Sequence, residues 1–216
     1  MEHLSEFIKI QGGQMRMKEI RNPNHPKKGS TMKVSPIRAK KDIKSILKLL
    51  SDNPRDRLLF LIGINNGLRC GDLLKLKVSD VSGMKIGDSL TIKEGKTGKE
   101  NVLVINKPVF EVLKHYLDFK KPEDEDYLFE SRKGKGAITI QAVNNKVKKW
   151  TSDINLKGNY GAHSLRKTWG YFQRTVYGVG FELICKRFNH SSPSITMRYL
   201  GIEDKEVQDL LMNEVG

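Results

Sequence analysis

The sequence contains few of the features that mark secreted, membrane-spanning or metal-binding proteins. Only two of its 216 residues are cysteine, Cys70 and Cys185, and they lie far apart in apolar or helical surroundings. This spacing provides neither a disulfide framework nor a zinc site, so we expect two reduced thiols. No apolar run reaches the roughly 18 residues of a membrane-spanning helix. The N-terminal stretch MEHLSEFIKI carries acidic side chains where a signal peptide is basic, which favours a cytoplasmic protein.

Two kinds of ligand-binding motif are also missing. The sequence has no nucleotide-binding phosphate loop and no acidic cluster with the spacing of metal ligands. The sequence therefore gives no sign of a metal ion or of another cofactor. Acidic residues are the minority among the charges, with 25 Asp and Glu against 39 Lys and Arg, a net charge of +14 and a pI of about 9.7. Solubility rarely needs so much charge of one sign, so the excess favours a polyanionic partner, nucleic acid before a membrane surface.

The first 35 residues differ from the rest of the chain. Pro23, Pro26 and Gly29 disfavour regular structure around them, and the first 50 residues hold twelve Lys and Arg against four Asp and Glu. We interpret residues 1–35 as a basic arm or linker, in which Lys27 and Lys28 are candidate contacts to a nucleic-acid backbone. A solvated tail without a partner explains the same composition equally well.

The remainder, residues 36–216, is predicted to form one domain, mainly α-helical with a small antiparallel β-sheet (α+β). Apolar residues at helical spacing, together with cap residues, predict helices over about residues 43–50, 54–65, 107–117, 141–150, 162–177, 181–188, 193–200 and 204–215. Two short aliphatic runs, 90–92 and 102–105, flank the glycine-containing segment EGKTGKEN. This pattern predicts a β-hairpin with a lysine-rich turn.

The segment from Asn189 to Leu200 points most directly to chemistry. Ser192 and Pro193 form a helix start, with Ser as the N-cap and Pro at the first helical position. His190 precedes this start, and Tyr199 lies about two turns into the helix. A tyrosine alone is usually a core residue, but a tyrosine beside several cations can attack a phosphate.

Four further basic side chains are candidates to surround such a phosphate. Arg69 follows the helix-breaking Gly67, so its guanidinium can be displayed at a helix start. Lys96 lies at or near the tip of the predicted hairpin. His163 and Arg166 are three residues apart on one helix and face the same side. Each of these residues alone is more often a solvated or structural side chain than a functional one.

Taken in order, these residues resemble the catalytic domain of the tyrosine recombinases, the phage integrase family. The resemblance rests on Gly-Leu-Arg at 67–69, Lys-Thr-Gly at 96–98 on a hairpin, His-x-x-Arg at 163–166, then His190 and Tyr199 nine residues later. It covers about residues 36–216. It implies the fold of DNA breaking-rejoining enzymes and six catalytic residues: Arg69, Lys96, His163, Arg166, His190 and Tyr199.

Three positions depart from the family pattern, none of them at a catalytic group. The residue three positions after the first arginine, usually Glu, is Asp72, which we expect to orient Arg69. Asn189 stands where Gly is common but also tolerates left-handed backbone, and Lys167 stands where His is common. Full-length relatives carry a separate helical core-binding domain of roughly a hundred residues. Residues 1–35 are too short for it, so we expect that domain to be absent or truncated.

The resemblance also implies an activity and a partner. It implies a site-specific recombinase or integrase that cleaves and rejoins double-stranded DNA through a covalent 3′-phosphotyrosine, without metal or ATP. Tyr199 is then the nucleophile, and Lys96 is the general acid for the leaving 5′-hydroxyl. Further candidate contacts to the DNA backbone are Lys93, Lys99 and Lys167. We favour a phage or other mobile element in a bacterium as the setting.

The family further implies a homotetramer on DNA and a monomer when free, with residues 204–216 exchanged between neighbouring protomers. Packing on its own domain explains the narrow apolar face of that helix equally well. Two other functions stay open at this point. One is a type IB topoisomerase-like enzyme that relaxes DNA with the same tyrosine chemistry. The other is a non-enzymatic basic DNA-binding protein that kept the fold.

Overall fold

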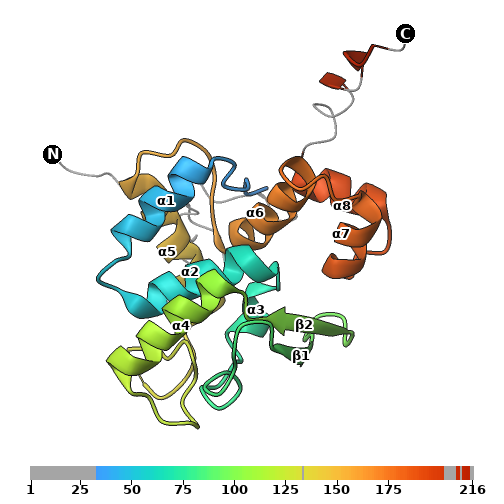
Figure 1. Cartoon of the computed structure of the whole chain (residues 1–216). Coiled ribbons are helices and arrows are strands. Elements are labelled where there is room, and N and C mark those ends of the chain that lie inside the picture. Colours follow the sequence, from blue (N-terminus) through green and yellow to red (C-terminus); the bar gives the residue numbers. More distant parts are fainter. Residues whose placement is uncertain (1–32, 133, 202–207, 210, 215–216) are drawn as a thin grey trace, which may run out of the picture. The chain divides into compact units, whose positions relative to one another are not determined.

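The computed structural model describes residues 33–132, 134–201, 208–209 and 211–214 (Figure 1). Within these residues the chain forms eight helices and a single two-stranded antiparallel sheet, which confirms the predicted, mainly α fold. No helix in this part of the chain is long and apolar enough to cross a membrane. Three predictions lie wholly or largely outside the described residues: the basic arm at 1–35, its lysines Lys27 and Lys28, and the C-terminal helix at 204–215.

Three helices begin with the same local signal, a polar cap followed closely by proline. The caps of α2 (Pro54–Asn66), α4 (Lys107–Lys120) and α8 (Pro193–Leu200) are Asn53, Asn106 and Ser192. Each cap side chain accepts a hydrogen bond from the backbone N–H three residues on, at 3.2, 3.2 and 3.4 Å. Such bonds satisfy amides that have no partner inside the helix. These starts therefore lie where the sequence predicts them.

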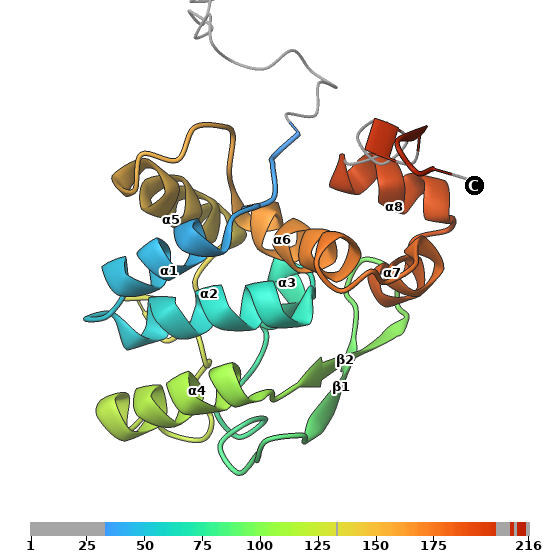
Figure 2. The same cartoon turned by 45° about the horizontal axis from the view of Figure 1, so that its top comes forward.

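Helix α2 is central to the main hydrophobic core, in contact with α4 and with α6 (Ala162–Thr175) (Figure 2). Residues 58–62 are all buried, so this part of α2 has no solvent-facing side. Gly63 permits the close approach of α6, because a Cβ there would lie 2.8 Å from the Leu165 side chain. Helix α5 (Ile140–Asp153) packs on α6, and α1 (Lys40–Leu49) packs on α5.

The hairpin pairs β1 (Ser89–Lys93) with β2 (Glu100–Val104), with Thr91 opposite Val102. Its root is fixed to the end of α2. The Asn66 amide nitrogen donates to the Val104 carbonyl at 3.2 Å, and the Val104 N–H donates to the Asn66 Oδ1 at 2.8 Å. This pairing satisfies the backbone at the end of β2 and fixes the open end of the hairpin to α2.

Helices α7 (Phe181–Phe188) and α8 build a second, smaller apolar cluster against α6. Phe188 and Leu200 are fully buried in it. Gly170 on α6 makes room for both, since a Cβ at that position would lie 2.7 Å from Phe188 and 2.9 Å from Leu200. The position of the α7–α8 pair therefore depends on one small residue.

Candidate active site

Arg69 lies at the junction between α2 and the short helix α3 (Cys70–Leu73). Gly67 ends α2 in the left-handed region, with φ of 60°, and Arg69 is the N-cap residue of α3. This confirms the predicted helix break and the display of Arg69 at a helix start. The guanidinium donates to the Phe188 carbonyl at 3.4 Å and forms an ion pair with Glu94. Its side chain keeps 17% of its surface exposed.

Arg166 is the more deeply buried of the two arginines. Its Nη1 donates to the Gly67 carbonyl at 2.6 Å and its Nη2 to the Phe188 carbonyl at 2.7 Å. The guanidinium also lies 4.2 Å from the centre of the Phe188 ring. Burial lowers the pKa of Arg166 from its ordinary value to about 10, which still leaves it charged at neutral pH. A rigid, charged group in this position suits the recognition of an anion.

His190 lies in the connection between α7 and α8, and Tyr199 lies in the last turn of α8. Asn189 ends α7 with a positive φ of 51°, which confirms that asparagine serves the left-handed position. The rings of His190 and Tyr199 lie 5.2 Å apart in an edge-to-face arrangement, and the Phe188 ring lies 5.2 and 5.5 Å from them. The ring nitrogen Nδ1 of His190 is 2.9 Å from the hydroxyl of the buried Thr196. The structure therefore brings His190 and Tyr199 together with Arg166 around one phenylalanine.

The Tyr199 hydroxyl is buried beside the Arg166 guanidinium, without a well-aligned hydrogen bond to it. Burial raises the pKa of the phenol above its ordinary value, although the positive charges of Arg166 and Arg69 act in the opposite direction. Tyr199 is therefore protonated in this state. Its ring lies under the ammonium of Lys167, which is 4.6 Å from the ring centre.

Lys96 and His163 are the exposed members of the set. Lys96 lies in the hairpin turn, and its charge is one of those that lower the pKa of His163 and His190. Desolvation is the larger cause for both histidines, and Arg166 and Arg69 contribute further. The pKa of His190 falls to about 4, so its imidazole is neutral at neutral pH. The charges of Arg69, Lys96 and Arg166 act on both histidines, and those of Arg69 and Arg166 also act on Tyr199, so the six predicted residues lie in one neighbourhood.

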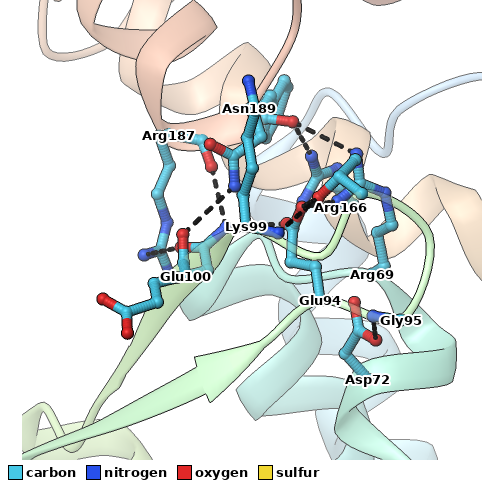
Figure 3. A network of polar contacts seen from close by, with 12 residues as sticks. Arg69, Asp72, Glu94, Gly95, Lys99, Glu100, Arg166, Arg187 and Asn189 are labelled. Atoms are coloured by element: carbon cyan, nitrogen blue, oxygen red, sulfur yellow. Dashed lines mark hydrogen bonds and ion pairs between the residues drawn. The ribbon is translucent and has the colours of Figure 1, made fainter.

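Two predictions about supporting residues need correction. Asp72 does not orient Arg69. Its Oδ1 accepts from the Gly95 N–H at 2.9 Å and its Oδ2 is buried without a partner, whereas Glu94 is the carboxylate on Arg69 (Figure 3). Lys167 is not displayed as a DNA-backbone contact, because it is buried against Tyr199. By contrast, Lys93 and Lys99 are exposed on the hairpin, so they stay candidates for such contacts.

A polar network that sequence reasoning missed supports the site (Figure 3). Arg187 on α7 donates to the Asn66 carbonyl and, at 2.6 Å, to the Asn101 side chain. Asn101 in turn donates to Glu94 at 2.9 Å and to the Arg187 carbonyl at 3.1 Å. This network joins α2, the hairpin and α7. The sequence contains no motif that predicts this network, because its residues are far apart along the chain and come together only when the chain folds.

No group of three or more His, Cys, Asp or Glu side chains that could hold a metal ion occurs in the part of the chain that the structure describes. The cations of the site are instead protein side chains. Their arrangement suits an anionic ligand with several oxygen atoms, such as a phosphodiester.

Comparison with known proteins decides the family. The pattern that defines the phage integrase family matches residues 38–206, well over half of the chain. The chain belongs to the phage integrase family. Over 174 residues it is 36% identical to the probable integrase/recombinase YoeC of Bacillus subtilis, an alignment that covers 79% of this chain and 91% of YoeC. It is 27% identical to the tyrosine recombinase XerA of Pyrococcus furiosus, over 100% of this chain and 75% of that protein.

Solved structures show the same fold for this integrase-family chain. A XerA recombinase matches with a TM-score of 0.68 at 19% identity, covering 84% of this chain and 67% of that one. XerH bound to its difH substrate gives 0.63 at 22% identity, over 85% and 56%. A lambda integrase dimer bound to a core site gives 0.58 at 18% identity, over 79% and 49%. Family and fold thus confirm the predicted tyrosine recombinase catalytic domain and its enzyme class.

Proposed function

We propose that this chain cleaves and rejoins double-stranded DNA at a specific site through a covalent 3′-phosphotyrosine on Tyr199. The observation that carries the proposal is the meeting of Arg69 and Arg166 at one backbone oxygen, that of Phe188, beside the rings of His190 and Tyr199. A tyrosine next to two fixed guanidinium groups is suited to attack a phosphodiester.

The arginines supply the electrostatic part of the mechanism. Attack on a phosphodiester builds negative charge on the two non-bridging oxygens, and guanidinium groups held in place beforehand stabilise that charge without reorganising. Arg166 is fixed by two short hydrogen bonds, and Arg69 keeps part of its surface open to the site. His190 donates a further hydrogen bond to the same phosphate when the Thr196 hydroxyl donates to its Nδ1, because the proton of the neutral ring is then on Nε2.

Proton transfer completes each step. The Tyr199 oxygen bonds to phosphorus and the bond from phosphorus to the 5′-oxygen breaks. The phenol proton passes to His163, which its lowered pKa keeps neutral and able to accept it. Lys96 protonates the leaving 5′-oxygen. In the rejoining step the 5′-hydroxyl of another strand attacks the phosphotyrosine, and the same groups act in reverse. The bond energy stays in the intermediate, so the exchange requires no ATP.

Charge and fold both favour DNA as the partner. The net charge of +14 favours a polyanion, and the exposed Lys93 and Lys99 extend the cationic surface along the hairpin. XerH and lambda integrase, which share the fold, are described as bound to DNA sites. Exchange between two duplexes cuts four strands, and each chain supplies a single nucleophile. We therefore extend the proposal to four copies on DNA and a monomer when free.

A trapping experiment tests the proposal although the target sequence is unknown. A duplex library with random flanks carries sulfur in place of one bridging 5′-oxygen, so that the released thiol rejoins poorly and the covalent adduct accumulates. We expect adducts whose recovered flanks share one sequence. A duplex of that sequence should then support strand exchange between two DNA molecules. Relaxation of a supercoiled plasmid without strand exchange would instead indicate topoisomerase-like function, and no adduct would contradict the proposal.

A further inference from the structure

Glu94 is a buried carboxylate that the catalytic steps do not use. It follows β1 directly and stands two residues before Lys96 in the hairpin turn. Its side chain is fully buried. A buried charge is strongly disfavoured unless it is paired and hydrogen-bonded, so the partners of Glu94 indicate what it does.

Those partners occupy both oxygens of the carboxylate. Oε2 forms the ion pair with Nη1 of Arg69 and also accepts from the Thr97 hydroxyl at 2.6 Å (Figure 3). Oε1 accepts from the Asn101 amide at 2.9 Å. Burial by itself raises the pKa of Glu94, but the hydrogen bonds from Thr97, Asn101 and Asn189 and the charge of Arg69 outweigh it and hold that pKa below its ordinary value. The carboxylate therefore stays ionised and fixed.

Glu94 does not occupy the place of a phosphate. A group standing where DNA binds would be open to solvent, whereas the Glu94 side chain is 0% exposed and that of Arg69 is 17% exposed. The carboxylate thus lies on the buried side of the guanidinium, whose Nη2 donates to the Phe188 carbonyl. An arginine held from one side in this way presents its other N–H groups in a defined direction.

The same contact couples Arg69 to the hairpin turn. Two links join the α3 segment to this turn, one from Arg69 to Glu94 and one from Asp72 to the Gly95 N–H. Lys96 stands between Gly95, whose N–H donates to Asp72, and Thr97, whose hydroxyl donates to Glu94. The backbone that carries Lys96 is therefore held on one side by Asp72 and on the other by Glu94, the carboxylate that pairs with Arg69.

We propose that Glu94 is the positioning residue of Arg69, and that Thr97 and Asn101 hold it in place for that role. Glu94 touches no reacting atom. It sets the direction of the guanidinium and ties it to the turn that carries Lys96. The proposal rests on the cleavage chemistry proposed above, and its tests therefore include one that needs no cleavage.

The first test compares Glu94→Gln with Glu100→Gln, an exposed carboxylate on the same hairpin. The rate of adduct formation is measured in a single turnover on the sulfur-containing duplex, with DNA affinity measured separately. Loss of the charge behind Arg69 should slow Glu94→Gln by about 10- to 100-fold, leave its affinity within about twofold, and leave Glu100→Gln unchanged. Thr97→Val, a milder change, should slow cleavage by about 3- to 10-fold. An unchanged or faster rate in Glu94→Gln would overturn the proposal.

A double-mutant cycle distinguishes positioning from a general structural role. In an Arg69→Lys background, Glu94→Gln should slow cleavage by less than about threefold, because its effect passes through Arg69. A full additional loss in that background would show that Glu94 acts elsewhere, and the proposal would be wrong.

The last test observes Arg69 directly, by NMR of the protein labelled with ¹⁵N in its arginine side chains. Arg69→Lys identifies the signal. In the unchanged protein the Arg69 Nη protons should give separate signals that reflect hindered rotation, and Glu94→Gln should merge them. Equal mobility in both proteins would contradict the positioning role. This measurement tests the positioning role without any cleavage of DNA. If the chain forms no adduct, the proposed function fails, whereas the contact between Glu94 and Arg69 is still tested.

Discussion

Arg69 and Arg166 donate to the same atom, the backbone carbonyl oxygen of Phe188, at 3.4 and 2.7 Å. One oxygen at the end of α7 thus sets the separation of the two guanidinium groups. Since α7 is held by the small cluster around Phe188 and Leu200, the packing of α7 on α6 also places the two guanidinium groups. Changes in that packing are expected to alter activity as well as stability.

Gly170→Ala tests the dependence on packing. The added Cβ would lie 2.7 Å from Phe188 and 2.9 Å from Leu200, so α7 and α8 must shift. Overpacking of this kind costs about 1–3 kcal/mol in the free energy of unfolding, measured by urea denaturation. We expect adduct formation to fall further than the stability loss explains, because the Phe188 carbonyl moves. Gly83→Ala, where nothing lies within 4 Å of the new Cβ, is the control and should match the unchanged protein in both measurements. Full activity in Gly170→Ala would contradict the dependence of adduct formation on the packing of α7 against α6.

Arg166→Lys tests the need for a planar, forked cation. A single ammonium cannot reach both the Gly67 and the Phe188 carbonyls in the geometry that the guanidinium uses. Loss of this fixed donor should lower the cleavage rate by about 10²- to 10³-fold. Single-turnover adduct formation measures the rate, with the exposed Arg132→Lys as the matched control. A loss below about fivefold would show that charge alone suffices.

His190 predicts a pH dependence of stability. Its pKa is about 4 in the folded protein against 6.5 ordinarily, with desolvation as the main cause. Between these values the unfolded chain binds a proton that the folded chain does not, so the free energy of unfolding should fall as pH drops from 6.5 to 4. His163 contributes with the same sign. Urea denaturation at several pH values across this range measures the free energy of unfolding. That free energy should change less with pH in His190→Asn than in the unchanged protein. His115→Asn, on the exposed side of α4, serves as control. Equal slopes for His190→Asn and the unchanged protein would contradict the assignment.

Lys96→Ala tests the assignment of the general acid. On ordinary DNA, loss of the proton donor should slow cleavage by about 10²- to 10⁴-fold. With sulfur at the bridging 5′ position, the leaving thiolate needs no proton, because a thiol has a pKa of about 8.5. The difference between Lys96→Ala and the unchanged protein should then shrink to a few-fold. Lys99→Ala, an exposed lysine on the same hairpin, should show no such dependence on the leaving group. Equal losses on both substrates would mean that Lys96 acts in another way.

Local signals in the sequence predicted much of the fold. The starts of α2 and α8 follow from Asn53-Pro54 and Ser192-Pro193, whose capping bonds involve only near neighbours. The end of α7 at Asn189 follows in the same way. The candidate catalytic residues were recognised only through their order along the chain, since no local rule places Arg69 beside Phe188, 119 residues later.

The supporting contacts could not be predicted in this way. Asp72 stands three residues from Arg69, which favours a direct contact, yet the hairpin turn folds between them and supplies both Gly95 and Glu94. Lys167 is next to Arg166, but its side chain is drawn over the Tyr199 ring by the packing of α8 on α6. Both outcomes depend on elements that are distant in sequence. The periodicity of apolar residues predicts such elements but not how they are arranged in space.

Identification of the residue that carries the DNA tests the central claim most directly. The unchanged protein and Tyr199→Phe are incubated with the sulfur-containing duplex, and covalent protein–DNA adducts are separated, digested and mapped by mass spectrometry. The account predicts an adduct from the unchanged protein with the 3′-phosphate on Tyr199, and none from Tyr199→Phe, although both bind DNA equally. An adduct that persists in Tyr199→Phe, or one mapped to another residue, would contradict the choice of Tyr199 as nucleophile.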